Sequence, residues 1–510
     1  MIQLNKLIVS YNYKQINPFI KVEEKVNIRA ARSSSNSSFW LIIMAIFFGN
    51  FMSILSSTTI NVAFPIFMTD FHAEISTVQW LITGFLLATG VVAPTVGYFG
   101  DKWSYKRLYV FALSGFTLFS GLCVIAWNIE SLIVFRILQG VFSGLIIPTT
   151  MTMIYQFIEK DKQAFALSLW SLSSMLAPAF GPTLGGWLTE YFGWRSLFIL
   201  NLPIGLIAIA VALKCIPFQR ISQSKIFDLR GFITVLVSSS SLILAFSQGN
   251  SWGWTSGKTL MFLAAGMLAL VYFIRRELSV KEPLLNLRVF QKKRYTYSLI
   301  VNCIITASLY SGTFLIPIYL QDIQHSTALD TALVLLPGSL VMALLSPVVG
   351  KLYTRVGPFW LILSGIMLLV ISTWELSHIT LVATHLYVAA WMTFRYVGIA
   401  LAFMPVTNAG MSAIPKENSG HASSVMNWVR QATGALSIGI FSSVLAARSL
   451  THQKELSEGS AAVTQLVKSQ GMILGVQDVF MIATIICVLA VPLTFLLRES
   501  RKEVRKEVIS

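Results

Sequence analysis

Charged residues are scarce in this chain, because Asp, Glu, Lys and Arg together make up only 12% of its 510 residues. In an ordinary soluble domain roughly a quarter of the residues are charged. In this chain 55% of the residues are hydrophobic. A soluble globule of this composition could not cover its surface with polar side chains. The scarcity of charge therefore excludes a soluble protein.

Residue types that build metal, disulfide or nucleotide sites are also rare. The four cysteines lie in or at the edges of apolar runs, which leaves neither a disulfide framework nor a CxxC metal pair. The six histidines form no HxxxH pair, and the chain has no GxxxxGK[ST] loop to bind ATP phosphates. We therefore expect no metal, no cofactor and no enzyme activity, with a polytopic membrane enzyme as a distant alternative.

Apolar residues are abundant and gathered into runs of about 20, the length that crosses the roughly 30 Å hydrocarbon core of a bilayer as a helix. The strict alternation over about 10 residues that is typical of a barrel strand does not occur. The chain is therefore predicted to be an all-α polytopic membrane protein. We place about fourteen transmembrane helices at 39–65, 79–100, 108–127, 131–155, 165–188, 195–215, 231–249, 259–275, 297–320, 331–350, 358–377, 383–410, 422–447 and 475–498.

Two features recur in the two parts of the chain. The second predicted span ends in the stretch Gly97–Asp101 and the tenth ends in Gly350–Arg355, and each is followed by a basic turn. Arg136 and Arg395 are each a lone cation inside an apolar run. The recurrence predicts two related six-helix halves. The predicted domains are a cytoplasmic N-terminal arm at 1–38, a first half at 39–215, two inserted spans and a cytoplasmic linker at 216–296, a second half at 297–498 and a cytoplasmic tail at 499–510.

The net charge of +16 is interpreted as membrane topology, since no basic cluster is interleaved with base-stacking aromatic residues and no nucleic-acid partner is expected. Loops rich in Lys and Arg remain in the cytoplasm. With an even number of spans, the basic clusters of the N-terminal arm, Lys102–Arg107, Arg220–Arg230, Arg275–Arg294 and Arg498–Lys506 all fall on one side. Both termini are therefore predicted to be cytoplasmic. The polar segment 450–473 has helical propensity, falls on the other side and is interpreted as a solvated connecting loop.

Two charged positions are candidate switch residues. The stretch GYFGDKWSYKRL, Gly97–Leu108, places Asp101 at a helix end and Arg107 after a tight turn, where a carboxylate can bind cations or helix amides and lock one conformation. Arg136, followed by Gln139, lies in an apolar run, where a guanidinium costs roughly 3 kcal/mol or more unless it is paired or hydrated. An ordinary capping loop around Asp101 and snorkelling of Arg136 to the interface are the alternatives.

The fifth predicted span contains an unusual number of helix-modifying residues. It reads LAPAFGPTLGGWL and includes Pro178, Gly181, Pro182, Gly185 and Gly186. Small residues let two helices approach closely, and proline frees backbone groups and bends a helix. Glycines alone could serve packing, but two prolines with a Gly-Gly pair indicate a hinge or gate in this span.

These three stretches resemble the recurring motifs of the 14-span drug/proton antiporter family of the major facilitator superfamily, and the similarity extends over roughly residues 40–500. The resemblance implies the major facilitator fold and secondary active export of amphipathic or cationic small molecules by alternating access. It also implies protons as the coupling ion and a monomer in the lipid bilayer of the bacterial plasma membrane. In that family the counterpart of Arg136 is linked to proton coupling, and the counterpart of Asp101 to the conformational switch.

Three positions depart from the family pattern. Ser56 stands where the family usually has an aspartate in the first span, Ser104 stands at the usual turn glycine, and Thr354 replaces the aspartate of the second-half loop. No substitute carboxylate is predicted near the midplane. His421 and His385 begin predicted spans, and histidine can change its charge near neutral pH. The coupling ion is therefore predicted to be a proton or another ion that binds without an aspartate at the position of Ser56.

The candidate substrate cavity is assigned to polar residues and to aromatic and methionine residues inside the spans, because rings and thioethers contact flat or cationic molecules well. These residues are Phe51, Ser56, Trp170, Met175, Phe314, Asn427 and Gln431. An importer or exporter of one specific metabolite on the same fold is the alternative function. The fifth-span Gly/Pro motif favours export, because importers lack it as a rule.

Overall fold

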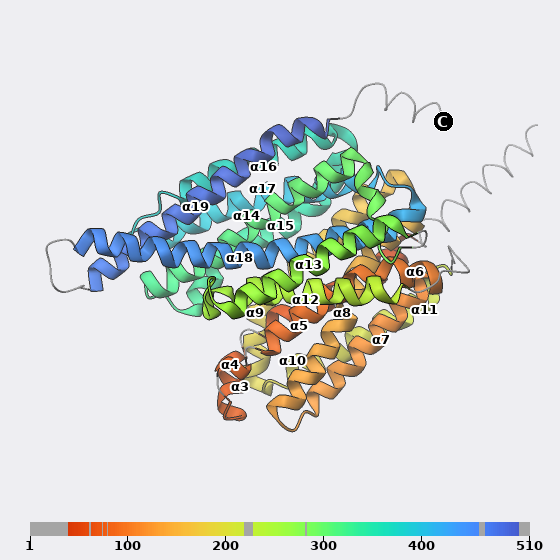
Figure 1. The fold of residues 1–510 in the computed structure, drawn as a ribbon, viewed down its shortest axis with the longest axis horizontal. Coiled ribbons are helices and arrows are strands. Elements are labelled where there is room, and N and C mark those ends of the chain that lie inside the picture. The colour runs from red at the N-terminus through yellow and green to blue at the C-terminus, as the bar shows by residue number, and fades with distance from the viewer. Residues whose placement is uncertain are drawn as a thin grey trace, which may run out of the picture.

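The computed structural model describes residues 39–60, 63–73, 75–78, 80–218, 228–280, 283–457 and 465–498. The predicted arm 1–38 and tail 499–510 lie outside the described residues. Within the described residues the secondary structure is helical and contains no strand (Figure 1). Thirteen helices there are long and apolar enough to cross a membrane. α9 (Lys160–Phe192), with 33 residues, covers the predicted fifth span in addition. The prediction of an all-α polytopic protein with about fourteen spans is confirmed.

Most helices begin and end close to the predicted spans. The chain first forms the helix Phe39–Thr59, α3 (Phe64–Asp70), α4 (Ile75–Val78), α5 (Trp80–Val92), η1 (Ala93–Thr95), α6 (Val96–Trp103), α7 (Tyr105–Val124), α8 (Ile129–Phe157), α9, α10 (Ser196–Ile199) and α11 (Asn201–Cys215). The inserted part forms α12 (Leu229–Trp252), α13 (Gly257–Ser279) and η2 (Leu287–Gln291). The remaining elements are α14 (Lys293–Ile318), η3 (Tyr319–Ile323), α15 (Ala328–Val356), α16 (Pro358–Leu376), α17 (His385–Met411), η4 (Lys416–Asn418), α18 (Ser419–Ser457) and α19 (Gln465–Leu496).

The segment 450–473 differs from its prediction as a solvated loop. α18 continues to Ser457 and α19 begins at Gln465, so the described residues of this segment are helical. The two helices pack closely there, because a Cβ on Gly471 would lie 3.0 Å from the carbonyl oxygen of Ser449. Close contact between helices at small residues stabilises a polar extension that the hydropathy pattern alone interprets as a loop.

The helices pack into two groups that meet along two seams. The first group contains the helices from Phe39 to Cys215, and the second contains α14 to α19. α9 packs against α15 along one seam, and η1, α6 and α8 pack against α18 along the other. The two groups meet at the end of the bundle where α6 and α8 terminate and α18 begins, called the Asp101 end below. In Figure 1 their opposite ends, at α3 and α4 and at the C-terminal end of α18 with the N-terminal end of α19, diverge.

The largest buried apolar cluster crosses between the two groups near the Asp101 end. It joins Tyr105 and Met151 of the first group to Met404 and Met426 of the second and to Leu285 before η2. A separate cluster around Phe67, Trp194 and Phe198 lies within the first group alone, at the opposite end. A third cluster joins Met175 of α9 to residues of the second group such as Met342 and Ala343 of α15. The apolar contacts between the groups therefore extend from the Asp101 end along the α9–α15 seam.

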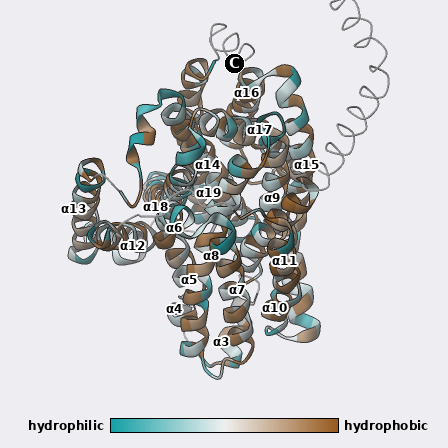
Figure 2. Ribbon diagram, turned by 90° about the vertical axis from the view of Figure 1, so that its right-hand side faces the viewer, coloured by the Kyte–Doolittle hydropathy of each residue, from teal (hydrophilic) through white to brown (hydrophobic). Residues whose placement is uncertain are grey.

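The inserted helices lie at the periphery of this bundle. α12 packs against α18 and α5, and α13 packs against α12 and η2. Figure 2 shows both helices at the edge of the molecule. The outer surface of α13 is apolar and exposed at Leu260, Met261, Met267 and Leu268, as expected of a helix that contacts lipid.

Candidate coupling and gating sites

Arg136 of α8 is fully buried and bound by the first helix. Its guanidinium donates to the hydroxyl of Ser56 at 2.8 Å, to the backbone carbonyl of Ser56 at 2.6 Å and to Oε1 of Gln139 at 2.5 Å. The Phe85 ring stacks on the guanidinium at 3.9 Å, a cation–π contact. Gln139 then donates to Ser120 at 3.0 Å. Arg136 therefore stays inside the bundle instead of snorkelling to the interface.

This cluster shows how a serine at position 56 can take the place of an aspartate. A hydroxyl and a carbonyl, both neutral, supply the acceptors that an aspartate would otherwise supply to the cation. Within the described residues no carboxylate forms an ion pair with Arg136, and its Nε has no hydrogen-bond acceptor. A buried cation without a counter-ion is costly, so the cluster is a place where an anion or a water molecule would be stabilised.

Arg395 of α17 repeats this arrangement in the second group. Only 1% of its surface is exposed, and its guanidinium donates to the backbone carbonyl of Ser308, to the Ser308 hydroxyl at 3.1 Å and to the Ser311 hydroxyl at 2.6 Å. Both serines belong to α14, the first long helix of that group. In each group, therefore, the fourth long helix donates an arginine to serine oxygens of the first. The serines of α14 were missed in the sequence, although two serines three residues apart in an apolar helix mark a polar face.

Asp101 connects the two groups at the Asp101 end. One carboxylate oxygen accepts from the Tyr105 hydroxyl at 2.9 Å, and the other lies 3.3 Å from Nε2 of His421, the third residue of α18. Asp101 and His421 are 2% and 3% exposed. Nδ1 of His421 accepts from the backbone amide of Asn286 at 3.3 Å, which leaves Nε2 as the nitrogen that donates to Asp101.

A second row of polar contacts lies next to this pair. The Thr152 hydroxyl is hydrogen-bonded to the hydroxyl of Ser423, and the hydroxyl of Tyr155 donates to Asn408 at 3.2 Å. The amide nitrogen of Gln156 donates to the hydroxyl of Ser419 at 2.9 Å. All three contacts run from the last turns of α8 to α17 or α18. The sequence did not single out these residues, since isolated polar residues at helix ends carry no distinctive spacing.

The capping of α7 differs from the capping by Asp101 that the sequence suggested. Ser104, not Asp101, caps α7, and its hydroxyl accepts from the Arg107 amide at 3.3 Å. Ser104 has a φ of +92°, a region that favours glycine, which explains why the family uses glycine in this turn. Arg107 itself is exposed, with its guanidinium 4.9 Å from the ring centroid of Phe218.

The fifth-span motif lies in α9 against the first helix. A Cβ on Gly185 would lie 3.0 Å from the carbonyl oxygen of Thr59, and one on Gly181 would overlap the Thr58 hydroxyl. These glycines therefore permit a close helix–helix contact. α9 continues as one helix from Lys160 to Phe192 through Pro178, Pro182 and Gly186, so its role as a hinge stays a prediction.

Two of the seven residues assigned to a substrate cavity line a central cavity between the two groups. Its volume is about 10 Å³, which has room for about one water molecule. It is lined by Met151, Trp170, Asn302, Phe403, Thr407, Met426, Asn427 and Arg430. Ser56 is bound to Arg136, and Met175 accepts a hydrogen bond from Ser346 across the α9–α15 seam. Phe51, Phe314 and Gln431 are half-buried.

Asp478 of α19 was also missed in the sequence analysis. It accepts from Arg448 Nε at 2.5 Å and lies 2.8 Å from Nε2 of His452. Both partners belong to α18 and lie at the end opposite Asp101. His385, the other histidine considered in the sequence, is exposed at that end and lies 3.0 Å from the Ser326 hydroxyl.

Comparison with known proteins fixes the family of this bundle. Residues 46–438 match the model of the Major Facilitator Superfamily. The chain belongs to this superfamily. It is 31% identical over 500 residues to the uncharacterized MFS-type transporter YhcA of Bacillus subtilis, covering 91% of this chain and 93% of that protein. It is 27% identical over 475 residues to the multidrug export protein EmrB of Haemophilus influenzae, covering 86% and 92%.

A solved structure has the same fold. The human organic anion transporter MFSD10 (TETRAN) superposes with a TM-score of 0.60 over 88% of this chain and 99% of that one, at 12% sequence identity. At that identity the likeness concerns the fold alone. Membership of the superfamily makes this chain a multi-pass membrane transporter of small molecules, and not an enzyme.

Proposed function

We propose that this chain is a multidrug-type exporter that moves amphipathic or cationic small molecules out of the cell in exchange for protons. The observation that carries the proposal is the contact of Asp101 with His421, which closes one end of the bundle between the two groups. The name of the EmrB relative supports drug export as the direction and type of transport.

Alternating access is supported by where the two groups touch. The contacts of Asp101 with His421 and of α8 with α18 gather at the Asp101 end, whereas the opposite ends of the groups diverge (Figure 1). The central cavity is too small for a drug-sized molecule, for which about 300 Å³ or more is typical. Transport would then require the Asp101 end to open and the opposite end to close.

We infer that the Asp101 end faces the cytoplasm of a bacterial cell. Exposed cations gather there at Arg107, Lys214, Arg230, Arg288 and Lys293. Positively charged loops are retained on the cytoplasmic side of the plasma membrane. The present conformation is then the outward-facing one, with the cytoplasmic gate closed and both termini in the cytoplasm.

Proton coupling is assigned to the Asp101–His421 pair together with the Arg136 cluster. His421 accepts from the Asn286 amide through Nδ1, so a second proton on the ring would break that contact. A proton on Asp101 would weaken the contact between the groups. Either event changes the relative free energy of the closed and open gates, which is what coupling requires.

The test is efflux of a fluorescent lipophilic cation from cells that overexpress the chain, with and without a protonophore. We expect efflux that stops when the proton gradient collapses. Asp101→Asn should lower the efflux rate at least about tenfold while the protein remains in the membrane, since the gate loses its charged acceptor. Glu417→Gln, which removes an exposed carboxylate at the same end, is the matched control and should export at the wild-type rate.

Two results would contradict the proposal in different ways. Efflux that survives the protonophore would leave the exporter but exclude protons as the coupling ion. Absence of efflux with correctly inserted protein would favour the alternative, a transporter of one specific metabolite, which the small central cavity and its single cation, Arg430, would accommodate after opening.

A further inference from the structure

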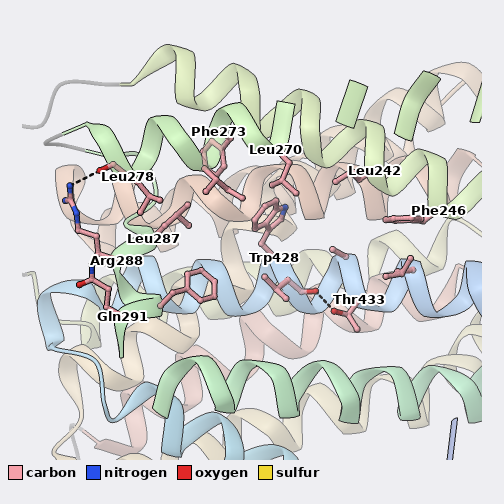
Figure 3. A pocket seen from close by; sticks show the side chains of 15 residues that line it. Leu242, Phe246, Leu270, Phe273, Leu278, Leu287, Arg288, Gln291, Trp428 and Thr433 are labelled. Atoms are coloured by element: carbon pink, nitrogen blue, oxygen red, sulfur yellow. Dashed lines mark hydrogen bonds between the residues drawn. The ribbon is translucent and has the colours of Figure 1, made fainter. Parts of the chain in front are cut away.

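A large apolar pocket lies outside the central cavity, between the inserted helices and α18. Its volume is about 660 Å³, within the range of small-molecule and lipid-chain sites. Figure 3 shows α13 and α12 on one side of it, α18 on the other and η2 closing one end. The lining residues are Leu242, Phe246, Leu270, Phe273, Ile274, Leu278, Leu287, Arg288, Phe290, Gln291, Trp428, Val429, Ala432, Thr433 and Leu436.

The shape of the pocket matches an extended chain. Its α18 wall runs from Trp428 to Leu436, nine residues whose eight steps rise about 12 Å along the helix. One leaflet of the hydrocarbon core is about 15 Å thick, half of the whole. The long axis of the pocket thus follows the helices through nearly one leaflet.

The two polar side chains of the α18 wall are satisfied within the protein. The indole nitrogen of Trp428 donates to Ser239 at 2.8 Å, and the hydroxyl of Thr433 donates to the carbonyl of Val429 at 2.8 Å. An occupant of the inner part therefore needs no polar atoms. A hydrocarbon chain meets this condition, since burying an unpaired polar group there would be costly.

The charge of the pocket lies at one end only. Arg288 is exposed at the mouth, where its guanidinium also donates to the carbonyl of Leu278 at 3.2 Å, and Gln291 lies beside it (Figure 3). Lys292 and Lys293 follow at once and are exposed. Among the described residues that line the pocket there is no carboxylate to repel an anion or to pair with a cationic drug. Basic sites between helices at the membrane surface bind anionic lipid headgroups.

We propose that this pocket binds an anionic phospholipid of the Asp101-end leaflet, with an acyl chain between α13 and α18 and the phosphate at Arg288. The site is distinct from the central cavity and from the Asp101–His421 gate. It does adjoin the gate, because Asn286, which directly precedes η2, donates its backbone amide to His421. The lipid therefore fills the seam between the insert and the helix that carries the gate histidine.

The test measures lipid retention by the purified full-length protein in mild detergent. The protein is incubated with equal amounts of phosphatidylglycerol and phosphatidylcholine of the same chain length, and retained lipid is counted by native mass spectrometry. We expect phosphatidylglycerol to be retained preferentially. Arg288→Gln should reduce that preference about fivefold, the effect of one cation beside an anionic lipid. Lys214→Gln, an exposed cation at the same end on α11, should leave it unchanged.

A second variant examines the apolar part of the pocket. Ala432→Trp fills it from α18 and should lower retention of both lipids, with thermal unfolding as the check that the variant is folded. If that variant does not fold, the comparison of Arg288→Gln with Lys214→Gln decides alone. Equal retention of the two headgroups, a preference that Arg288→Gln leaves intact, or displacement of the lipid by a transported cation would overturn the proposal. Lipid retention is independent of export, so its failure would leave the proposed function untouched.

Discussion

Arg136 and Arg395 are the residues whose environment most constrains this molecule. Each is a fully buried cation held by serine oxygens of a neighbouring helix, and no carboxylate among the described residues forms an ion pair with either. The stability of the Arg136 site depends on geometry. The planar guanidinium donates to two oxygens of Ser56 at once, and an ammonium group lacks this fixed pair of donors. The lone arginines were visible in the sequence, but their serine partners became apparent only when the helices were packed.

Substitutions at Ser56 should change stability in opposite directions. Ser56→Ala removes one acceptor from Arg136 and should lower the free energy of unfolding by about 1–2 kcal/mol. Ser56→Asp places a carboxylate against the buried cation and should raise the melting temperature in detergent. Ser53→Asp is the control. Ser53 is also buried, but its hydroxyl is hydrogen-bonded to that of Ser143, so a charge at this position should lower the stability of the protein. Destabilisation by Ser56→Asp would mean that Arg136 is already neutralised.

The inserted hairpin of α12 and α13 is fastened at the Asp101 end by an ion pair. Arg276 of α13 donates to both carboxylate oxygens of Asp228, at 2.7 to 2.9 Å, and Asp228 also caps α12 by accepting from the Gly231 amide at 3.0 Å. Burial by itself would raise the pKa of Asp228. The hydrogen bonds from Arg276 and Gly231 outweigh it, and the pKa of the carboxyl lies below its ordinary value.

The hairpin anchor should therefore depend on pH in a defined direction. A carboxyl with a lowered pKa stabilises the folded state above its unfolded pKa of about 3.9, and this contribution is lost as the pH falls further. Asp228→Asn should lower the free energy of unfolding by about 2 kcal/mol at pH 7. The difference from wild type, measured by thermal unfolding at pH 5 and below, should shrink below about pH 4. A difference that grows on acidification would contradict the assignment.

At the scale of the whole molecule, one end is tied by polar contacts between the groups and the other diverges. Thr152 and Ser423 join α8 to α18 beside the Asp101–His421 pair, so these contacts must break together if the gate opens. In the proposed mechanism this end has a closed and an open arrangement, and a ligand or proton that binds one of them better shifts the population toward it. The conformation described here is the one in which the Asp101 end is closed.

Covalent closure of this end should stop transport. In the double variant Thr152→Cys and Ser423→Cys, oxidation should form a disulfide, because the two side chains are in hydrogen-bond contact across the groups. Efflux should fall to the level of cells without the protein and should return after addition of a reductant. Each single variant should export at the same rate before and after the oxidant is added. Unimpaired efflux by the cross-linked protein would show that the Asp101 end does not open during transport.

The sequence by itself determined the membrane class, the approximate spans and the positions of the buried charges. Runs of about 20 apolar residues allow only helices across a bilayer, and a lone Arg136 or Arg395 in such a run is visible without any structure. The tertiary structure decided which residues meet, such as Asp101 with His421 and Arg395 with Ser308. It also decided that 450–457 and 465–473 are helical and that a pocket separates the insert from α18. The reason is that local hydropathy sets whether a segment enters the membrane, whereas contacts between residues hundreds of positions apart depend on how the helices pack.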